Sequence, residues 1–128
     1  MNIVDSSGWL EFFSDGPNSD SFSDPLQDSS SLIVPVITIY EVFKVVLRES
    51  GENEALQAAA AMQKGKVVDL TTPIAMNASK LSLQYSLPMA DSIILSTAQL
   101  YDCTIWTQDA GFENIPGVKF FPKLPEDA

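Results

Sequence analysis

The sequence predicts a single α/β domain over residues 1–128, a three-layer α/β/α arrangement around a mostly parallel sheet of four to five strands. Three observations support this prediction. Short β-branched segments alternate with helical segments along the chain, as they do in parallel α/β proteins. The 128 residues are 45 % hydrophobic, which is enough to bury one core. The stretch 87–112 has the residue patterns of a helix, a buried strand and an acidic turn in direct succession.

Within this stretch the helix and the strand have distinct patterns. Pro88 suits the first turn of a helix, where its missing N–H is not needed. Apolar residues then recur at the spacing of one helical face: Ile93, Ile94, Thr97, Ala98 and Tyr101. Residues 103–107 (CTIWT) are β-branched and aromatic, as in a covered central strand. Asp91 therefore falls in the first helical turn, and Asp109 falls just beyond the carboxyl end of the strand.

A strand and a short helix begin the chain. Residues 1–5 (MNIVD) predict a strand that ends on Asp5. Ser6 and Ser7 then supply hydroxyl groups that can cap a helix over 8–13. Asp5 is thus a second acid at the carboxyl end of a strand, next to the start of a helix.

Residues 14–30 differ in composition from the rest of the chain. They are rich in Ser and Asp and contain glycine and proline breakers, so we expect a solvated loop or a marginal helix. Phe22 and Leu26 are spaced for one short helical turn with a buried face. The alternative is a mobile flap beside a functional site, because long loops often carry function.

The middle of the chain contains the next strand and helix. Residues 31–35 predict a strand, and a helix over 38–50 follows and stops at Gly51. Thr38 and Glu41 have the spacing of a capping box. Two interpretations of Glu41 stay open: it only caps the helix, or it lies at the helix start and also faces the acids at the strand ends.

Lys44 and Arg48 follow Glu41 at i+3 and i+7 on the same helical face. They are either solvated surface charges or the one compact basic ridge beside the acids. The remaining predicted elements are a helix over 52–64, a strand over 67–70, a helix over 72–85 with Thr72 as its cap, a strand over 118–121 and a frayed tail over 122–128.

The amino-acid composition excludes several classes of function. With 17 acidic and 7 basic residues the net charge is −10, so a basic footprint for nucleic acid is not visible. The chain has no histidine, which excludes imidazole as a general base or a metal ligand. Its one cysteine, Cys103, excludes an internal disulfide and a cysteine zinc site. No apolar run is long enough to span a membrane and no secretory leader is evident, so we expect a cytoplasmic protein.

Four acids fall at strand ends or helix starts, where parallel α/β proteins bind ligands. They are Asp5, Glu41, Asp91 and Asp109. Four carboxylates in one pocket would repel each other, and a divalent cation would make the arrangement tolerable. Oxygen ligands favour Mg²⁺ or Mn²⁺ over zinc.

Four segments resemble the PIN domain, and more closely the ribonuclease toxins of VapC-type toxin–antitoxin pairs. They are Asp5-Ser6-Ser7 after the first strand, TIYEVFKVVLRE around Glu41, MADSIILSTA around Asp91 and WTQDAGF around Asp109. The resemblance covers nearly the whole chain in the expected order, and its final third is the most specific part.

The resemblance implies a metal-dependent ribonuclease that hydrolyses phosphodiester bonds of RNA with Mg²⁺ or Mn²⁺. The acids that match the family's catalytic and metal-binding positions are Asp5, Glu41, Asp91 and Asp109. Ser7 and Thr107 match supporting hydroxyl positions, and Lys44 and Arg48 are candidate phosphate contacts. Gly111 departs from the family pattern, because close relatives often carry a second Asp there; affinity for a second ion is therefore in question.

The resemblance also implies a homodimer that a cognate antitoxin protein holds inactive. Three alternatives remain open on the sequence. A phosphoacceptor receiver domain would need an early acid pair and a lysine after the last strand, whereas Asp5 stands alone and the late lysines are Lys119 and Lys123. An aspartyl-nucleophile phosphatase would need a second acid at Ser7. The third is a catalytically weak PIN-fold module that acts only by binding its partner.

Overall fold

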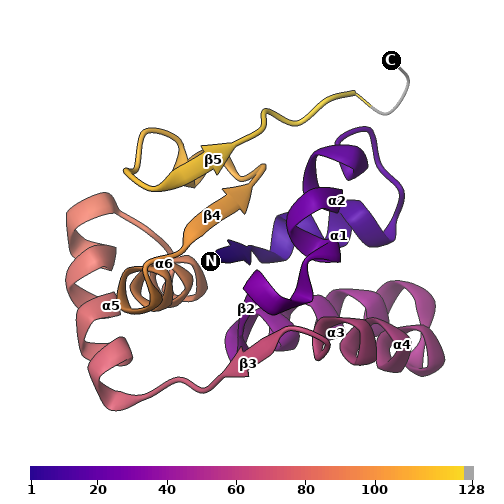
Figure 1. Cartoon of the computed structure of the whole chain (residues 1–128), viewed down its shortest axis with the longest axis horizontal. Helices are drawn as coiled ribbons and strands as arrows, with labels where there is room; N and C mark the ends of the chain where they lie inside the picture. Colours follow the sequence, from indigo (N-terminus) through magenta and orange to yellow (C-terminus); the bar gives the residue numbers. More distant parts are fainter. Residues whose placement is uncertain (126–128) are drawn as a thin grey trace.

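The computed structural model describes residues 1–125 and contains short parallel strands between helices (Figure 1). The strands are β1 (Asn2–Val4), β2 (Ile33–Pro35), β3 (Lys66–Val68), β4 (Thr104–Thr107) and β5 (Val118–Phe120). The α-helices are α1 (Ser6–Phe13), α2 (Ser19–Gln27), α3 (Val36–Ser50), α4 (Glu52–Met62), α5 (Thr72–Tyr85) and α6 (Met89–Tyr101). Two short 3₁₀ turns are η1 (Ser29–Ser31) and η2 (Ala110–Phe112). Residues 122–125 have no regular secondary structure, and the rest of the predicted frayed tail lies outside the described residues.

All strand pairs are parallel, as the sequence predicts. Strands β1, β4 and β5 form one sheet and β2 and β3 form another, and a single bridge between Asn2 and Leu32 joins the two. The spatial order is therefore β3-β2-β1-β4-β5. The chain moves outward from β1 to β3 and then returns to the other side of β1, so the strand order reverses between β1 and β4. Ligands of open α/β sheets bind at such a switch point.

Alternate residues of the strands feed two separate cores, which gives the three-layer arrangement. Ile3, Ile33 and Ile105 pack with apolar residues of α5 and α6. Val4 and Val34 pack on the other face with side chains of α1 to α4, which include Trp9, Phe22, Val42, Ala58 and Met62. Figure 1 shows the same division, with α5 and α6 on the left and α1 to α4 on the right of the strands.

The polar segment 14–30 is structured, so the prediction of a solvated loop is wrong for most of it. The short helix suggested by the spacing of Phe22 and Leu26 is present as α2, and the Phe22 side chain is fully buried. Asn18 fixes the start of this helix, because its amide donates to Oε1 of Gln108 and to the carbonyl of Pro122. The segment is therefore packed against the core rather than free to act as a flap.

The start of α3 also differs from the prediction, and the capping box is wrong. The helix begins at Val36, directly after Pro35, which ends β2 and occupies the N-cap position without a side-chain cap. Thr38 consequently lies in the first turn and points inward: it is fully buried, and its hydroxyl has no hydrogen-bond partner in the described structure. The Glu41 carboxylate accepts a hydrogen bond from Ser6 of α1 instead of capping its own helix.

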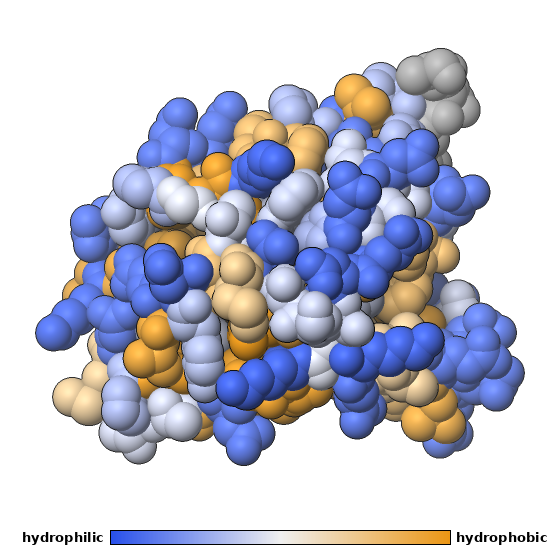
Figure 2. All heavy atoms as spheres, in the orientation of Figure 1, coloured by the Kyte–Doolittle hydropathy of each residue, from blue (hydrophilic) through white to orange (hydrophobic). Residues whose placement is uncertain are grey.

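On the face shown in Figure 2, hydrophilic residues predominate and the hydrophobic residues lie in separate small groups. Among the described helices none is both long enough and apolar enough to cross a membrane.

Candidate metal centre

The pairing of β1 with β4 brings two of the predicted acids to one edge of the sheet. Val4 lies opposite Trp106 in the parallel ladder, and the backbone N–H of Asp5 continues it by donating to the Trp106 carbonyl at 3.1 Å. Asp5 and Asp109 therefore follow the carboxyl ends of adjacent strands, on either side of the point where the strand order reverses.

Asp5 forms the buried floor of this edge, with a relative exposure of 2 %. Its Oδ1 accepts hydrogen bonds from the Ser7 hydroxyl at 2.7 Å and the Gly8 backbone N–H at 3.0 Å, so Asp5 is the N-cap of α1. Its Oδ2 accepts from the Thr107 hydroxyl at 2.6 Å. Ser7 and Thr107, predicted as supporting residues, thus both contact Asp5. The helix cap, by contrast, is Asp5 itself and not a serine hydroxyl.

The protonation of Asp5 reflects its burial. Loss of solvation raises the pKa of Asp5 to about 6, although the hydrogen bonds from Thr107, Ser7 and Gly8 oppose the shift. The nearby charge of Asp109 raises it further. Three donors hold the carboxyl group in one orientation, and its ionised form remains costly without a positive partner.

Asp91 lies in the first turn of α6, as predicted, and shares the electrostatic environment of the other acids. Loss of solvation raises the pKa of Asp91 to about 7, and the charges of Asp109, Asp5 and Glu41 add to the shift. The charges of all three thus act on Asp91, which indicates that the four predicted acids lie near one another. Asp91, Asp109 and Glu41 are only partly buried, whereas Asp5 is buried.

The other two acids each have one oxygen engaged by a donor. Oδ1 of Asp109 accepts from the Gly111 N–H at 2.9 Å, and the Asp109 N–H donates to the Thr107 hydroxyl at 2.9 Å. Glu41 accepts from Ser6 through Oε1. The Asp109 side chain also hydrogen-bonds with Asp91, which contributes to the raised pKa of Asp91.

The donor set fits a hard divalent cation. Four carboxylates supply only oxygen ligands, and the ion pair found among residues 1–125, Arg48 with Glu49, involves none of them. Within the same residues no group of three or more acidic or cysteine side chains is placed so that it could hold a metal ion without moving. The four acids are therefore a group of like charges with one buried member, Asp5, and three partly exposed members.

Two predicted substrate residues do not join this group. Lys44 and Arg48 lie exposed on the outer side of α3: the Lys44 ammonium is 5.7 Å from the centre of the Tyr40 ring, and Arg48 pairs with Glu49 at 3.3 Å. Gly111, where relatives often carry an acid, lies next to Asp109: a Cβ there would be 3.3 Å from Oδ1 of Asp109. A carboxylate at 111 would therefore adjoin the site that the four acids form.

Ser7 and Thr107 are predicted from the sequence, whereas two further polar residues that support the site, Ser6 and Gln108, are missed. Ser6 carries a hydrogen bond to Glu41, although its position suggests only a helix cap. The Gln108 N–H donates to the Ser7 hydroxyl at 3.2 Å, and its side chain is held by Asn18. One sequence signal points to Ser6. Because Asp5 can itself cap α1, the hydroxyl groups of Ser6 and Ser7 are both available for other hydrogen bonds.

A groove of about 800 Å³ lies between α1, α3 and α4, next to the site. Ser7 and Gln108 form the part of its lining that touches the Asp5 hydrogen-bond network. The charged side chains of its lining are Glu11, Glu49, Glu54 and Lys123. The groove is thus mainly acidic, like the site beside it.

Solved structures of bacterial toxin–antitoxin proteins share this fold. The chain superposes on a toxin–antitoxin complex from Klebsiella pneumoniae with a TM-score of 0.81 and 22 % identity, covering 97 % of this chain and 100 % of that chain. VapC20 from Mycobacterium tuberculosis, described as a sarcin-ricin loop cleaving toxin, gives 0.77 and 13 %, covering 91 % and 95 %. FitAcB from Neisseria gonorrhoeae gives 0.65 and 17 %, covering 87 % and 89 %.

No curated protein matches the chain in sequence. The model of the PIN domain family, by contrast, matches residues 3–118, which extend from β1 into β5 and include all four acids. With the fold and the family match in agreement, this chain belongs to the PIN domain family.

Proposed function

We propose that this protein is a Mg²⁺- or Mn²⁺-dependent ribonuclease that acts as the toxin of a toxin–antitoxin pair in the cytoplasm. The observation that carries the proposal is the coupling of Asp91 to the other three acids, with no basic partner for them in the described structure. Such a site is stable in its ionised form only with a cation. A structural neighbour, VapC20, is described as a sarcin-ricin loop cleaving toxin.

Each acid would have a different task. When bound, a divalent cation would make a coordinated water more acidic and stabilise the charge that develops on the phosphoryl oxygens. Asp5 and Asp91 would hold it, and Asp5 is oriented for this by Ser7, Gly8 and Thr107. Asp109 and Glu41 would complete the ligand set, and the carboxylate of either would be a candidate to accept a proton from water.

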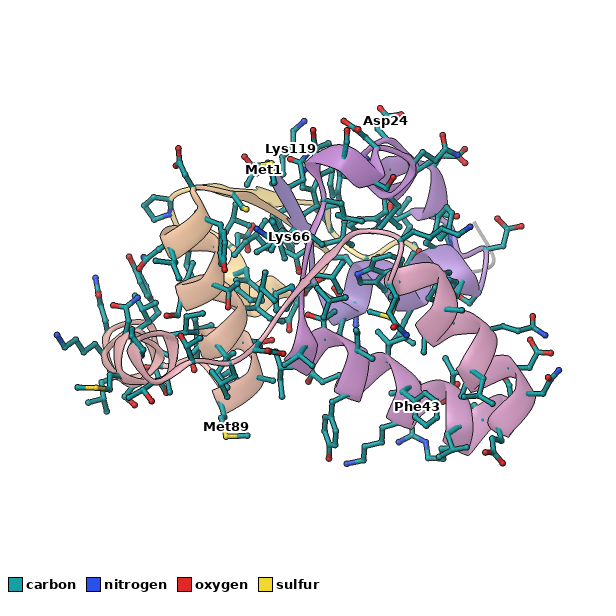
Figure 3. The ribbon with its side chains drawn as sticks, turned by 60° about the horizontal axis from the view of Figure 1, so that its bottom comes forward. Met1, Asp24, Phe43, Lys66, Met89 and Lys119 are labelled. Atoms are coloured by element: carbon teal, nitrogen blue, oxygen red, sulfur yellow. The ribbon has the colours of Figure 1, made fainter. Side chains whose placement is uncertain are left out.

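RNA cleavage tests this function. The purified protein is incubated with total RNA and with a sarcin–ricin hairpin, the loop cleaved by the M. tuberculosis relative, in Mg²⁺, in Mn²⁺ and in EDTA. We expect cleavage with either ion, none in EDTA, and none by Asp91→Asn. Asp24→Asn is the matched control, because Asp24 is exposed on α2 (Figure 3). Cleavage by Asp91→Asn at the wild-type rate would overturn the site assignment.

The acidic groove supports a basic antitoxin segment as the partner. Apolar residues of its lining, among them Leu10, Val45 and Val46, suit the apolar face of an amphipathic segment. Its acidic residues Glu11, Glu49 and Glu54 suit lysine or arginine side chains of that segment. Because Ser7 and Gln108 line the groove, a bound segment would lie beside the hydrogen-bond network of Asp5.

A homodimer is supported by exposed apolar side chains on α3 and at the start of α6. Tyr40, Leu47 and Met89 have relative exposures of 59 %, 43 % and 71 %. Figure 3 shows Met89 and Phe43 of α3 along the same lower side of the molecule. Size-exclusion chromatography with light scattering tests this: Tyr40→Glu should convert a dimer into a monomer.

The alternatives have less support. A receiver domain needs a lysine beside the acids. Lys119 instead packs on Trp106, with its ammonium 4.2 Å from the centre of the ring. The indole N–H of Trp106 donates to Asn2. In an aspartyl phosphatase Ser7 would be a second acid, and here it donates a hydrogen bond to Asp5. A binding module without catalysis remains the second candidate, and the cleavage assay above distinguishes it.

A further inference from the structure

The hydroxyl group of Ser6 has a specific partner far away in the sequence. Ser6 is the first residue of α1, and its Oγ donates to Oε1 of Glu41, 35 positions later on α3. A serine at this position usually serves its own helix, but the N-cap of α1 is Asp5. The Ser6 hydroxyl is therefore free to bond across to another element.

This bond constrains a side chain that otherwise has considerable freedom. Glu41 is partly exposed, and no ion pair to it occurs among the described residues. A glutamate has several rotatable bonds, and fixing them costs conformational entropy that an incoming cation would otherwise have to offset. By occupying Oε1, Ser6 selects one orientation and leaves Oε2 as the available ligand atom.

Ser6 also ties Glu41 to Asp5. Asp5 and Ser6 are joined by one peptide unit, so the bond from Ser6 fixes the Glu41 carboxylate relative to the buried carboxylate of Asp5. Ser7 performs the corresponding task for Asp5 itself, at 2.7 Å. Residues 5–7 thus form one platform at the start of α1 that sets two of the four acids.

We propose that Ser6 is a positioning residue for Glu41: its hydrogen bond holds the Glu41 carboxylate toward the metal centre and so raises the affinity for the cation. This inference rests on the proposed function, because it assigns Glu41 to the cation site. Donors that orient metal ligands typically change metal affinity or activity by about 10- to 100-fold when removed.

Calorimetric titration with Mn²⁺ tests the proposal independently of RNA cleavage. We expect Ser6→Ala to weaken Mn²⁺ binding by about tenfold or more, whereas Ser6→Thr, which keeps the hydroxyl, retains most of the affinity. Cleavage by Ser6→Ala should be lost at low Mn²⁺ and largely recovered at saturating Mn²⁺. The matched control is Ser30→Ala, because the Ser30 hydroxyl also donates to a carboxylate, Oδ1 of Asp28 at 2.9 Å, on an exposed segment.

A double-mutant cycle separates positioning from a general structural effect. If Ser6 acts through Glu41, then Ser6→Ala should weaken Mn²⁺ binding no further in a Glu41→Gln background. Wild-type affinity in a folded Ser6→Ala protein would overturn the inference, and so would an equal loss in both backgrounds. Either result leaves the proposed function intact if the wild type binds Mn²⁺ and cleaves RNA, whereas a wild type that does neither overturns both.

Discussion

At the scale of single residues, hydrogen bonding decides what the burial of a polar side chain costs. Asp5 and Thr38 are both almost fully buried, yet Asp5 has three donors and Thr38 has none in the described structure. A buried hydroxyl without a partner costs free energy, whereas a hydrogen-bonded carboxylate can be kept for function. The hydrogen bonds therefore stabilise the buried carboxyl group of Asp5, whereas the buried hydroxyl group of Thr38 lowers the stability of the fold.

Replacing Thr38 should therefore stabilise the protein. Thr38→Val keeps the shape and removes the unpartnered hydroxyl, and we expect the free energy of unfolding to rise by about 1 kcal/mol. The control is Thr97→Val, because the buried Thr97 hydroxyl donates to the Ile93 carbonyl at 2.8 Å and its loss should be destabilising. Chemical denaturation measures both changes. A loss of stability in Thr38→Val would mean that the hydroxyl group is bonded after all.

At the scale of elements, the junctions between strands and helices set the site. The strand ends that place Asp5 and Asp109 follow from β-branched segments and could be predicted. The start of α3 could not, because Pro35 both ends β2 and occupies the N-cap position, so the helix begins before the capping pattern at Thr38. The buried contact of Asn18 with Gln108 depends on residues 90 positions apart, for which local pattern holds no signal.

The contact between α1 and α2 depends on a residue without a side chain. A Cβ at Gly8 would lie 2.5 Å from Cγ1 of Val4 and 2.9 Å from the Phe22 ring. An alanine in a helix normally gains up to about 1 kcal/mol over glycine, but overpacking a core costs about 1–3 kcal/mol.

We therefore expect Gly8→Ala to lower the free energy of unfolding by about 1–2 kcal/mol. The clash with Val4 should be partly relieved in Val4→Ala, so the effects of the two changes should not add. Thermal unfolding of the single and double variants measures this coupling. A Gly8→Ala protein that is more stable than the wild type would show that α1 can shift away from the sheet.

At the scale of the whole molecule, the acids connect stability with pH. The raised pKa values of Asp5 and Asp91 mean that the folded state binds protons more tightly than the unfolded chain. Their contribution to stability is therefore fully present below about pH 4 and is lost as the pH rises through about 6 to 7. The metal-free protein keeps this site at neutral pH at a cost in stability.

Neutralising Asp91 should recover part of that cost. In the absence of divalent ions we expect Asp91→Asn to be more stable than the wild type at pH 8, by about 1–2 kcal/mol after allowance for its partial exposure. The gain should shrink toward pH 4, where the wild-type carboxyl group is protonated. Thermal unfolding across this range tests it, with Asp24→Asn as the control. A gain independent of pH would contradict the electrostatic explanation.

The central claim is that the four acids bind one divalent cation between them, and calorimetric titration with Mn²⁺ tests it most directly. We expect the wild type to bind Mn²⁺ with release of protons near pH 6.5, because Asp5 and Asp91 must ionise to act as ligands. Asp91→Asn and Asp109→Asn should lose most of the affinity, and Asp24→Asn should keep it. Equal Mn²⁺ affinity in the wild type and in Asp91→Asn would contradict the claim.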